Sequence, residues 1–209
     1  MNATATRCLP RLLDSARDRE LRALRTELLL RRESTTRADV VAIVSAGREE
    51  GRSTLAADLA VAFAEAGHPT LLVDADLRNP RQHELFELPD GHGLVQLLQD
   101  GTTPLIHSPV SLGDLDIITA GGIPARPLDL LSHPGFAHEI DGWRDEYRFV
   151  VLDTPPLADW PDAAVIANAT GRVLLATRGG RTGYRELRLT LRRLAPTRSR
   201  VMGAVINHF

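Results

Sequence analysis

The chain has 209 residues, of which 43% are hydrophobic and 25% charged, and its formal net charge is −2. This length and composition suit one domain with a hydrophobic core, and a charge so close to zero gives no electrostatic reason to expect nucleic acid as a partner. The single cysteine, Cys8, excludes an internal disulfide, and no apolar run approaches the roughly 20 residues that cross a bilayer. We therefore expect a cytoplasmic protein without direct membrane insertion.

Residues 10–33 carry leucine and alanine near a 3.6-residue period, with arginine and acidic residues between them, which predicts one amphipathic helix. We divide the chain into an N-terminal helical arm, residues 1–37, and a domain that spans residues 38–209. The arm either packs on its own domain or serves as an oligomerisation element that joins copies of the chain.

Short, apolar, β-branched runs alternate with helical patterns through the rest of the chain. The predicted strands are 40–44, 70–73, 116–119, 149–152, 172–176 and 201–206. The predicted helices are 54–66, with Gly67 as a C-terminal cap, 136–147, 162–169 and 184–194. Strands separated by helices of this length form βαβ units, so the predicted fold is α/β, a mostly parallel sheet with helices on both faces in three layers.

Polar clusters follow three of these strands: SAGREEGRST after the first, DADLR after the second and DTPP after the fourth. Ligands of parallel sheets bind at the carboxyl edge, so three clusters at that edge indicate a ligand site better than any one alone. We therefore expect the site at the carboxyl ends of the first, second and fourth strands.

The first cluster lies where a phosphate-binding loop, G-x-x-x-x-G-K-[ST], connects a strand to a helix. Residues 46–53 read AGREEGRS: Gly51 and Ser53 match, Ala46 replaces the first glycine, and Arg52 replaces the lysine. Backbone N–H groups and a helix N-terminus would still face a phosphate, but the planar guanidinium of arginine places its charge differently from a lysine ammonium. The alternative is an ordinary strand-to-helix turn.

Glu49 and Glu50 put two carboxylates inside this loop. A carboxylate about 4 Å from a phosphate oxygen would repel it by roughly 1 kcal/mol in water and about 4 kcal/mol at an effective dielectric constant of about 20. Phosphate binding therefore favours side chains that point outward or pair with Arg48 or Arg52.

Two aspartate motifs carry a resemblance to a known family. LLVDADLRNPRQHELFELP, residues 71–89, resembles the second Walker motif of the bacterial tyrosine kinases that control capsule and exopolysaccharide assembly, and FVVLDTPP, residues 149–156, is similar to their Walker B motif. LDIITAGGIPARPLDLL resembles their segment of a strand followed by a Leu-Leu helix, and GAVINHF resembles their last strand, with Asn207 in its usual place. The resemblance implies a P-loop nucleotide-binding fold related to the Min/Par ATPases.

The resemblance also implies a role for each matching residue. Asp74 would accept the proton of a tyrosine hydroxyl, Asp76 would support the metal site, and Arg52 would stand in for the catalytic lysine, which makes the catalytic set Arg52, Asp74, Asp76 and Asp153. Mg²⁺ would be held by Ser53, Asp74 and Asp153. The nucleotide would be bound by Gly47, Gly51, Arg52, Ser53, Thr54 and Asn207. Each strand-end aspartate has an alternative role as the cap of a following turn or helix.

The sequence departs from the family pattern in the loop and in the first helix. Arg52 replaces the loop lysine and Glu49 replaces a loop glycine, which weighs against catalysis rather than against the fold. The family builds ring-shaped oligomers through a helix motif, E-x-x-R-x-x-R. Arg22 and Arg25 match this motif, while Arg19 takes the glutamate position.

A third departure concerns tyrosine. The family has a tyrosine-rich tail that is phosphorylated, whereas this sequence ends at Phe209 and contains only Tyr147 and Tyr184. We expect Tyr147 to pack beside a core strand and Tyr184 to lie exposed at the start of a helix. Phosphorylation of a tail in the manner of the family is not expected.

The resemblance implies an ATP-binding, tyrosine-kinase-like protein in capsular or exopolysaccharide biosynthesis and export, with ATP/ADP and Mg²⁺ as cofactors. Its expected partner is a membrane-embedded polysaccharide co-polymerase or adaptor protein, which would bring it to the inner membrane. Two alternatives remain: a catalytically degenerate, nucleotide-binding regulator or scaffold of such a co-polymerase, and a Min/Par-type positioning ATPase.

Overall fold

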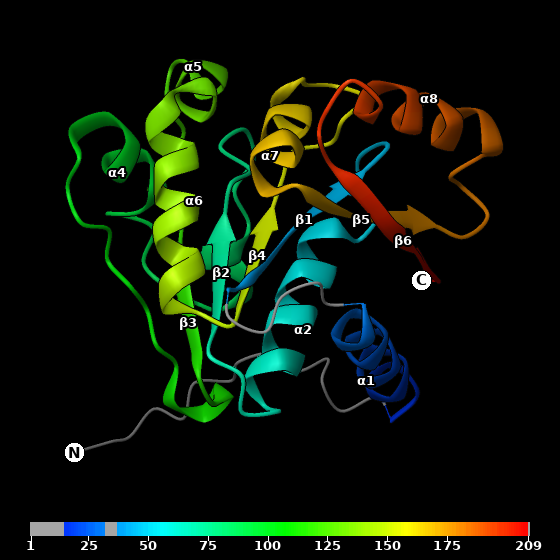
Figure 1. Ribbon diagram of the computed structural model, residues 1–209, viewed down its shortest axis with the longest axis horizontal. Coiled ribbons are helices and arrows are strands. Elements are labelled where there is room, and N and C mark those ends of the chain that lie inside the picture. The colour runs from blue at the N-terminus through cyan, green and yellow to red at the C-terminus, as the bar shows by residue number, and fades with distance from the viewer. Residues whose placement is uncertain (1–14, 32–36, 209) are drawn as a thin grey trace.

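The computed structural model describes residues 15–31 and 37–208, which form one parallel sheet between helices (Figure 1). The strands are β1 (Asp39–Ser45), β2 (Thr70–Asp74), β3 (Leu115–Ile118), β4 (Phe149–Asp153), β5 (Arg172–Arg178) and β6 (Arg200–Asn207). Their order in the sheet is β3-β2-β4-β1-β5-β6, and every neighbouring pair is parallel. The predicted fold class is confirmed.

Helices cover both faces of this sheet. On one face lie α1 (Ser15–Leu30) and α2 (Arg52–Ala64), and on the other lie α4 (Leu94–Asp100), α5 (Pro127–Ser132), α6 (Pro134–Glu146), α7 (Asp162–Thr170) and α8 (Tyr184–Leu194). Strand β1 shows why its sequence is a continuous apolar run: Val40 and Ala42 enter one core, and Val41 enters the other. A central parallel strand is buried on both faces and therefore needs no polar alternation.

Every predicted strand and helix within the described residues of the domain is present, with ends that differ from the prediction by at most two residues. Helix α2 ends at Ala64, and Gly67, at φ 76°, donates its N–H to the Ala64 carbonyl at 2.9 Å. The sequence did not predict α3 (Gln82–Leu85), α4 or the 3-10 turn Val110–Leu112. These segments are too short for a helical period to emerge from the apolar pattern.

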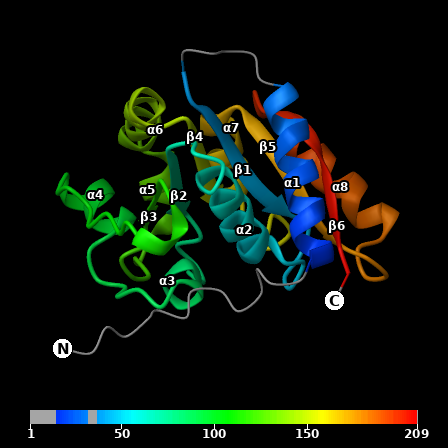
Figure 2. The ribbon, with the colours of Figure 1, turned by 90° about the horizontal axis from the view of Figure 1, so that it is seen from below.

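Helix α1 is the described part of the predicted N-terminal helix and lies beside α2 (Figure 2). Leu21 is buried there, Arg17 pairs with the buried carboxylate of Asp58, and Arg25 Nη1 donates to the Ala62 carbonyl at 2.9 Å. Helix α1 thus packs on the domain. Its use in oligomerisation and the domain division remain predictions.

Parts of the sequence predictions fall outside the described residues. Cys8 lies there, and so do residues 10–14, 32 and 33 of the predicted helix. Within residues 15–31 and 37–208, no helix combines the length and the apolar character that a membrane span requires.

Candidate functional site

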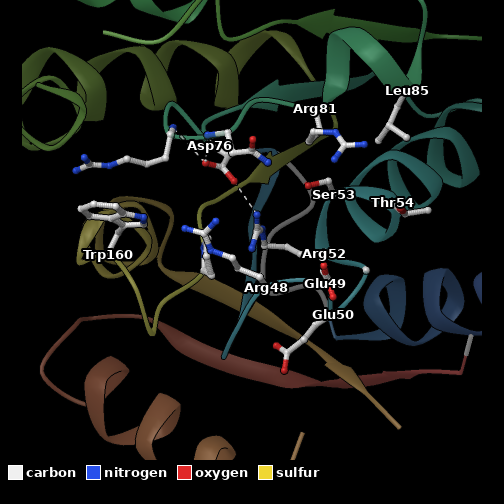
Figure 3. Close-up of a pocket in the computed structure, with 14 residues that line it drawn as sticks. Arg48, Glu49, Glu50, Arg52, Ser53, Thr54, Asp76, Arg81, Leu85 and Trp160 are labelled. Atoms are coloured by element: carbon white, nitrogen blue, oxygen red, sulfur yellow. Dashed lines mark hydrogen bonds and ion pairs between the residues drawn. The ribbon is translucent and has the colours of Figure 1, made fainter. Parts of the chain in front are cut away.

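The three polar clusters meet at one edge of the sheet because β2, β4 and β1 are neighbours in it. The strand register places Asp74 of β2 and Ile43 of β1 on either side of Asp153 of β4. A pocket of about 480 Å³ opens beside these strand ends, and its lining comes from residues 48–54, from parts of 76–85, and from the segment that follows β4 (Figure 3). The three clusters thus lie together beside this pocket, at the edge of the sheet where a ligand site is predicted.

The loop after β1 turns into α2 at Gly51. This residue has φ 77°, a left-handed conformation that favours glycine, and its carbonyl accepts the first helical hydrogen bond from Leu55 at 2.8 Å. The first N–H groups of a helix have no partner within the helix, so they present a positive end to the pocket. Ser53 and Thr54 lie in this first turn and line the pocket. Anions bind at such helix starts.

The two loop glutamates are held by different hydrogen-bond partners. Glu49, at φ 59°, is exposed and accepts from Arg181 Nη1 at 2.7 Å, which holds the pKa of its carboxyl below the ordinary value. Glu50 is buried, and its carboxylate accepts from the Gly47 N–H at 3.0 Å and from the Thr182 hydroxyl at 2.5 Å. Neither glutamate pairs with the loop arginines considered from the sequence.

Arg52 turns back toward the strand ends rather than along the loop. Its Nε donates to Asp153 Oδ1 at 3.1 Å, its Nη2 to Asp76 Oδ2 at 2.7 Å, and its Nη1 to the Ser45 hydroxyl at 2.9 Å. Only 10% of the Arg52 side chain is exposed. The guanidinium therefore neutralises the carboxylates of two different strands, which the loop pattern alone did not predict.

Asp74 organises the backbone that follows β2. Its Oδ2 accepts from the N–H groups of Arg81 and Gln82 at 2.9 and 2.8 Å, and its Oδ1 accepts from the N–H of Asp76 at 3.2 Å. Burial, and then the neighbouring charge of Asp153, raise the pKa of Asp74 well above its ordinary value. Asp74 thus lies behind the pocket lining, in the turn-capping geometry that was the alternative role for this residue.

Asp76 is the carboxylate of this motif that lines the pocket. Its Oδ1 accepts from the N–H groups of Arg78 and Asn79 at 3.2 and 3.0 Å. Burial raises the pKa of Asp76 above its ordinary value, while the Arg52 guanidinium opposes that rise. Asp76 is thus positioned by the backbone and remains linked electrostatically to Arg52.

Gln82 is a residue of this site that the sequence analysis missed. It is fully buried, and its Nε2 donates to Asp153 Oδ2 at 2.8 Å and to the Ser53 carbonyl at 3.1 Å. Among the described residues its Oε1 has no hydrogen-bond partner. Gln82 thus links the end of β4 to the start of α2 by hydrogen bonds. In the sequence it is only one polar residue in a short segment without an apolar period, so no pattern marked it.

The donor chemistry of the site suits Mg²⁺, since carboxylate and hydroxyl oxygens are the ligands that this hard cation prefers. Each carboxylate oxygen of Asp74, Asp76 and Asp153 nevertheless already accepts a hydrogen bond in this arrangement. Within the described ranges, no group of three or more histidine, cysteine, aspartate or glutamate residues is arranged to hold a metal ion. The residue types therefore fit magnesium, while the Arg52 side chain occupies one carboxylate oxygen of Asp76 and one of Asp153.

The wall opposite the loop carries an aromatic and a cationic side chain. The Arg78 guanidinium lies 4.0 Å from the centre of the Trp160 ring and donates to the buried carboxylate of Asp162 at 3.0 and 3.3 Å. Arg78 and Trp160 both line the pocket. Figure 3 shows the Trp160 ring in this lining. Sequence reasoning gave neither residue a function, because a cation–π pair between segments that far apart leaves no pattern in the chain.

The remaining nucleotide-binding candidates separate into two groups. Gly51, Arg52, Ser53 and Thr54 line the pocket. Gly47 lines a second cavity of about 310 Å³ between the loop and α8. Asn207, at the end of β6, donates its Nδ2 to the Glu50 carbonyl at 2.7 Å and so supports the loop from behind.

Comparison with known proteins gives a consistent set of relatives, although no family model matches. The chain is 35% identical over 168 residues to the tyrosine-protein kinase YwqD of Bacillus subtilis, a match that covers 80% of this chain and 71% of YwqD. It is 32% identical over 189 residues to the tyrosine-protein kinase Etk of Escherichia coli, with 90% of this chain covered. The chain spans 26% of the length of Etk.

Solved structures show the same relationship. The chimerical protein CapA2B2 superposes with a TM-score of 0.86 at 34% identity, covering 93% of this chain and 85% of that one. The kinase domain of Etk gives a TM-score of 0.83 at 32% identity, with coverages of 90% and 74%. The cell-division ATPase MinD of Pyrococcus furiosus, at 20% identity and a TM-score of 0.69 over 81% of this chain and 72% of that one, shares the fold alone.

Proposed function

The chain belongs to the family of bacterial tyrosine-protein kinases, and from this premise we propose that it binds ATP in the 480 Å³ pocket and transfers the γ-phosphoryl group to tyrosine hydroxyls of proteins. The observation that carries the proposal is that the phosphate loop and Asp76 line one pocket, while Arg52 of that loop also bonds to the buried Asp153. Phosphoryl transfer needs an anion cradle, a cation and a proton acceptor in one place.

In the proposed reaction the phenolic oxygen of tyrosine forms a bond to the γ-phosphorus, the bond from that phosphorus to the bridging oxygen breaks, and ADP leaves. The backbone N–H groups at the start of α2 hold the phosphates, with Ser53 and Thr54 beside them. The proton of the hydroxyl passes to Asp76, which lines the pocket and whose pKa burial raises above its ordinary value. Ser53 and Asp153, with Asp74 beside them, would hold Mg²⁺, which would neutralise part of the charge of the phosphates.

The relatives favour this function over the two alternatives. The relatives Etk and YwqD, both above 30% identity, are named as tyrosine-protein kinases, whereas the likeness to MinD is confined to the fold. We further propose that the protein acts in capsular or exopolysaccharide biosynthesis, on the cytoplasmic side of the inner membrane, through a membrane-embedded polysaccharide co-polymerase or adaptor. The greater length of Etk supports a further segment or partner in such systems.

The proposal is tested with purified protein, ATP, Mg²⁺ and a tyrosine-containing peptide, with phosphotyrosine quantified over time. We expect phosphotyrosine to form with the unaltered chain and to disappear in Asp153→Asn, which keeps the shape of the side chain and removes its charge. Calorimetric titration with ATP and ADP establishes binding separately. Tight ATP binding without phosphotyrosine, or a signal that survives in Asp153→Asn, would contradict the assignment.

A further inference from the structure

The Arg52 side chain is held in three directions at once. Its three nitrogen groups donate separately to Asp76, Asp153 and the Ser45 hydroxyl, at distances of 2.7 to 3.1 Å. The Ser45 hydroxyl in turn donates to the Gly47 carbonyl at 2.8 Å, which ties this arrangement to the phosphate loop. In Figure 3 the guanidinium points at Asp76, toward the strand ends. A planar fork makes these contacts together, whereas a lysine offers a single nitrogen.

The two carboxylates cannot easily lose this cation. The side chains of Asp76 and Asp153 are 1% and 0% exposed. Arg52 is the cation that forms ion pairs with both of them within the described parts of the chain. An uncompensated buried charge is strongly unfavourable, so departure of the guanidinium requires another positive charge at the same oxygens.

The other donors to these carboxylates are less able to leave. Asp76 Oδ1 accepts from two backbone N–H groups of the 78–79 turn, and Asp153 Oδ2 accepts from the buried amide of Gln82. Asp76 Oδ2 and Asp153 Oδ1 instead accept from Arg52, whose long side chain can rotate away and leave these two oxygens free. Access of any cation to the Asp76–Asp153 pair is thus controlled by one side chain.

We propose that Arg52 is a resident counter-cation that closes a latent divalent-metal site formed by Asp76 and Asp153. Metal binding and Arg52 release are then one exchange: the metal takes the two carboxylate oxygens, and the guanidinium moves to the phosphate loop, where an anion compensates its charge. The proposal rests on the proposed function only for the identity of that anion. The closed metal site itself is a property of the chain without nucleotide.

The test measures binding of Mn²⁺, as a divalent probe, to the full chain without nucleotide by electron paramagnetic resonance. The unaltered protein is expected to bind Mn²⁺ weakly, because Arg52 fills the site. Arg52→Met keeps an unbranched stem like that of arginine and removes the cation. We expect it to tighten Mn²⁺ binding by about tenfold or more, since a unit charge about 4 Å away opposes a metal ion even at an effective dielectric constant of about 20.

Arg48→Met is the matched control. Arg48 lines the same pocket but pairs with Asp159 at 2.7 Å, so its loss leaves the two buried carboxylates paired with Arg52. We expect the Mn²⁺ affinity of this control to change by less than about twofold, as for an exposed charge. Adding Asp76→Asn to Arg52→Met should return the affinity to the level of the unaltered protein, because one of the two metal-binding carboxylates is then lost.

Thermal unfolding shows whether each variant is folded. If Arg52→Met does not fold, Arg52→Gln, which keeps an amide donor toward the carboxylates, replaces it with the same expectation. Tight Mn²⁺ binding by the unaltered chain, no gain in folded Arg52→Met or Arg52→Gln, or an equal gain in Arg48→Met would each overturn the proposal. Since no nucleotide is present, failure here leaves the kinase assignment intact, and absence of kinase activity leaves this result intact.

Discussion

Arg52 and Asp153 lie 101 residues apart in the sequence, and the Nε of Arg52 donates to Oδ1 of Asp153 at 3.1 Å. The residue that replaces the loop lysine is thereby paired with the aspartate at the end of β4, the position of the Walker B carboxylate. The charge that phosphate binding needs is engaged elsewhere in this state. If the proposed phosphoryl transfer needs the Arg52 charge at the phosphates, this pair has to open first, so substitutions in the loop test the proposal.

Restoring the loop pattern should accelerate phosphotyrosine formation. In Arg52→Lys combined with Glu49→Gly, a compact ammonium replaces the fork that bridges two carboxylates, and one loop carboxylate is gone. We expect the initial rate with ATP and Mg²⁺ to rise by about tenfold, equivalent to about 1.4 kcal/mol of barrier. Glu49→Gly alone is the control, and a double variant no faster than this control would show that Arg52 does not limit the reaction.

Glu49 adopts a left-handed backbone conformation that favours glycine, at φ 59°. Glu49→Gly should therefore stabilise the fold by about 1 kcal/mol relative to Glu49→Ala, which keeps a Cβ in the same conformation. Both variants lose the exposed pair with Arg181, which contributes little at the surface. Urea unfolding of the two variants gives the comparison, and equal midpoints would mean that the loop relaxes without strain.

Glu50 holds the phosphate loop to the segment before α8 through the Gly47 N–H and the Thr182 hydroxyl. Glu50→Ala leaves the partly buried Gly47 N–H without its acceptor and should lower the free energy of unfolding by about 1 to 2 kcal/mol. Glu50→Gln keeps one carbonyl acceptor and should lose less. Glu20→Ala, at an exposed position of α1, serves as the surface control for the same denaturant measurement, and a loss no larger than in this control would show that the tether does not stabilise the loop.

The buried carboxyl of Asp74 should make stability depend on pH. Its pKa is raised in the folded chain, mainly by burial, so above the ordinary value of 3.8 the folded state binds more protons than the unfolded state. The free energy of unfolding should therefore fall as pH rises from about 4 through the raised pKa, by up to about 1.4 kcal/mol per pH unit. Asp74→Asn should flatten that part of the profile in urea unfolding at a series of pH values, and an unchanged slope would refute the assignment.

Tyr184 should be the tyrosine of this chain that accepts phosphate. It is 78% exposed, whereas Tyr147 is half-buried and donates its hydroxyl to Asp116 at 2.8 Å. Burial, and secondly the hydrogen bond to Asp116, raise the pKa of Tyr147 above its ordinary value. Its hydroxyl therefore gives up its proton less readily than that of an exposed tyrosine. We expect mass spectrometry after incubation with ATP to find phosphate at Tyr184, and Tyr184→Phe to remove most of the signal. Phosphate confined to Tyr147 would contradict this.

The sequence predicted the sheet well because its central strands are buried on both faces. Runs such as 40–44 and 149–152 have to be continuously apolar, and the polar clusters have to follow them at the carboxyl edge. The exposure of Tyr184 and the packing of Tyr147 were also predicted, from their places at a helix start and before a strand. By contrast, the short helices α3 and α4 depend on local capping and tertiary contacts, and the apolar pattern does not record them.

The sequence by itself determined which residues would gather at the site, since Arg52, Asp76 and Asp153 each follow a strand of one parallel sheet. Only the tertiary structure decided which of them pair. The order β2-β4-β1 brings buried carboxylates within reach of Arg52, and their need for a counter-charge turns that side chain back from the loop. The orientation of the Glu50 side chain is likewise set by Thr182, 132 residues further along the chain, because a buried carboxylate needs hydrogen-bond donors.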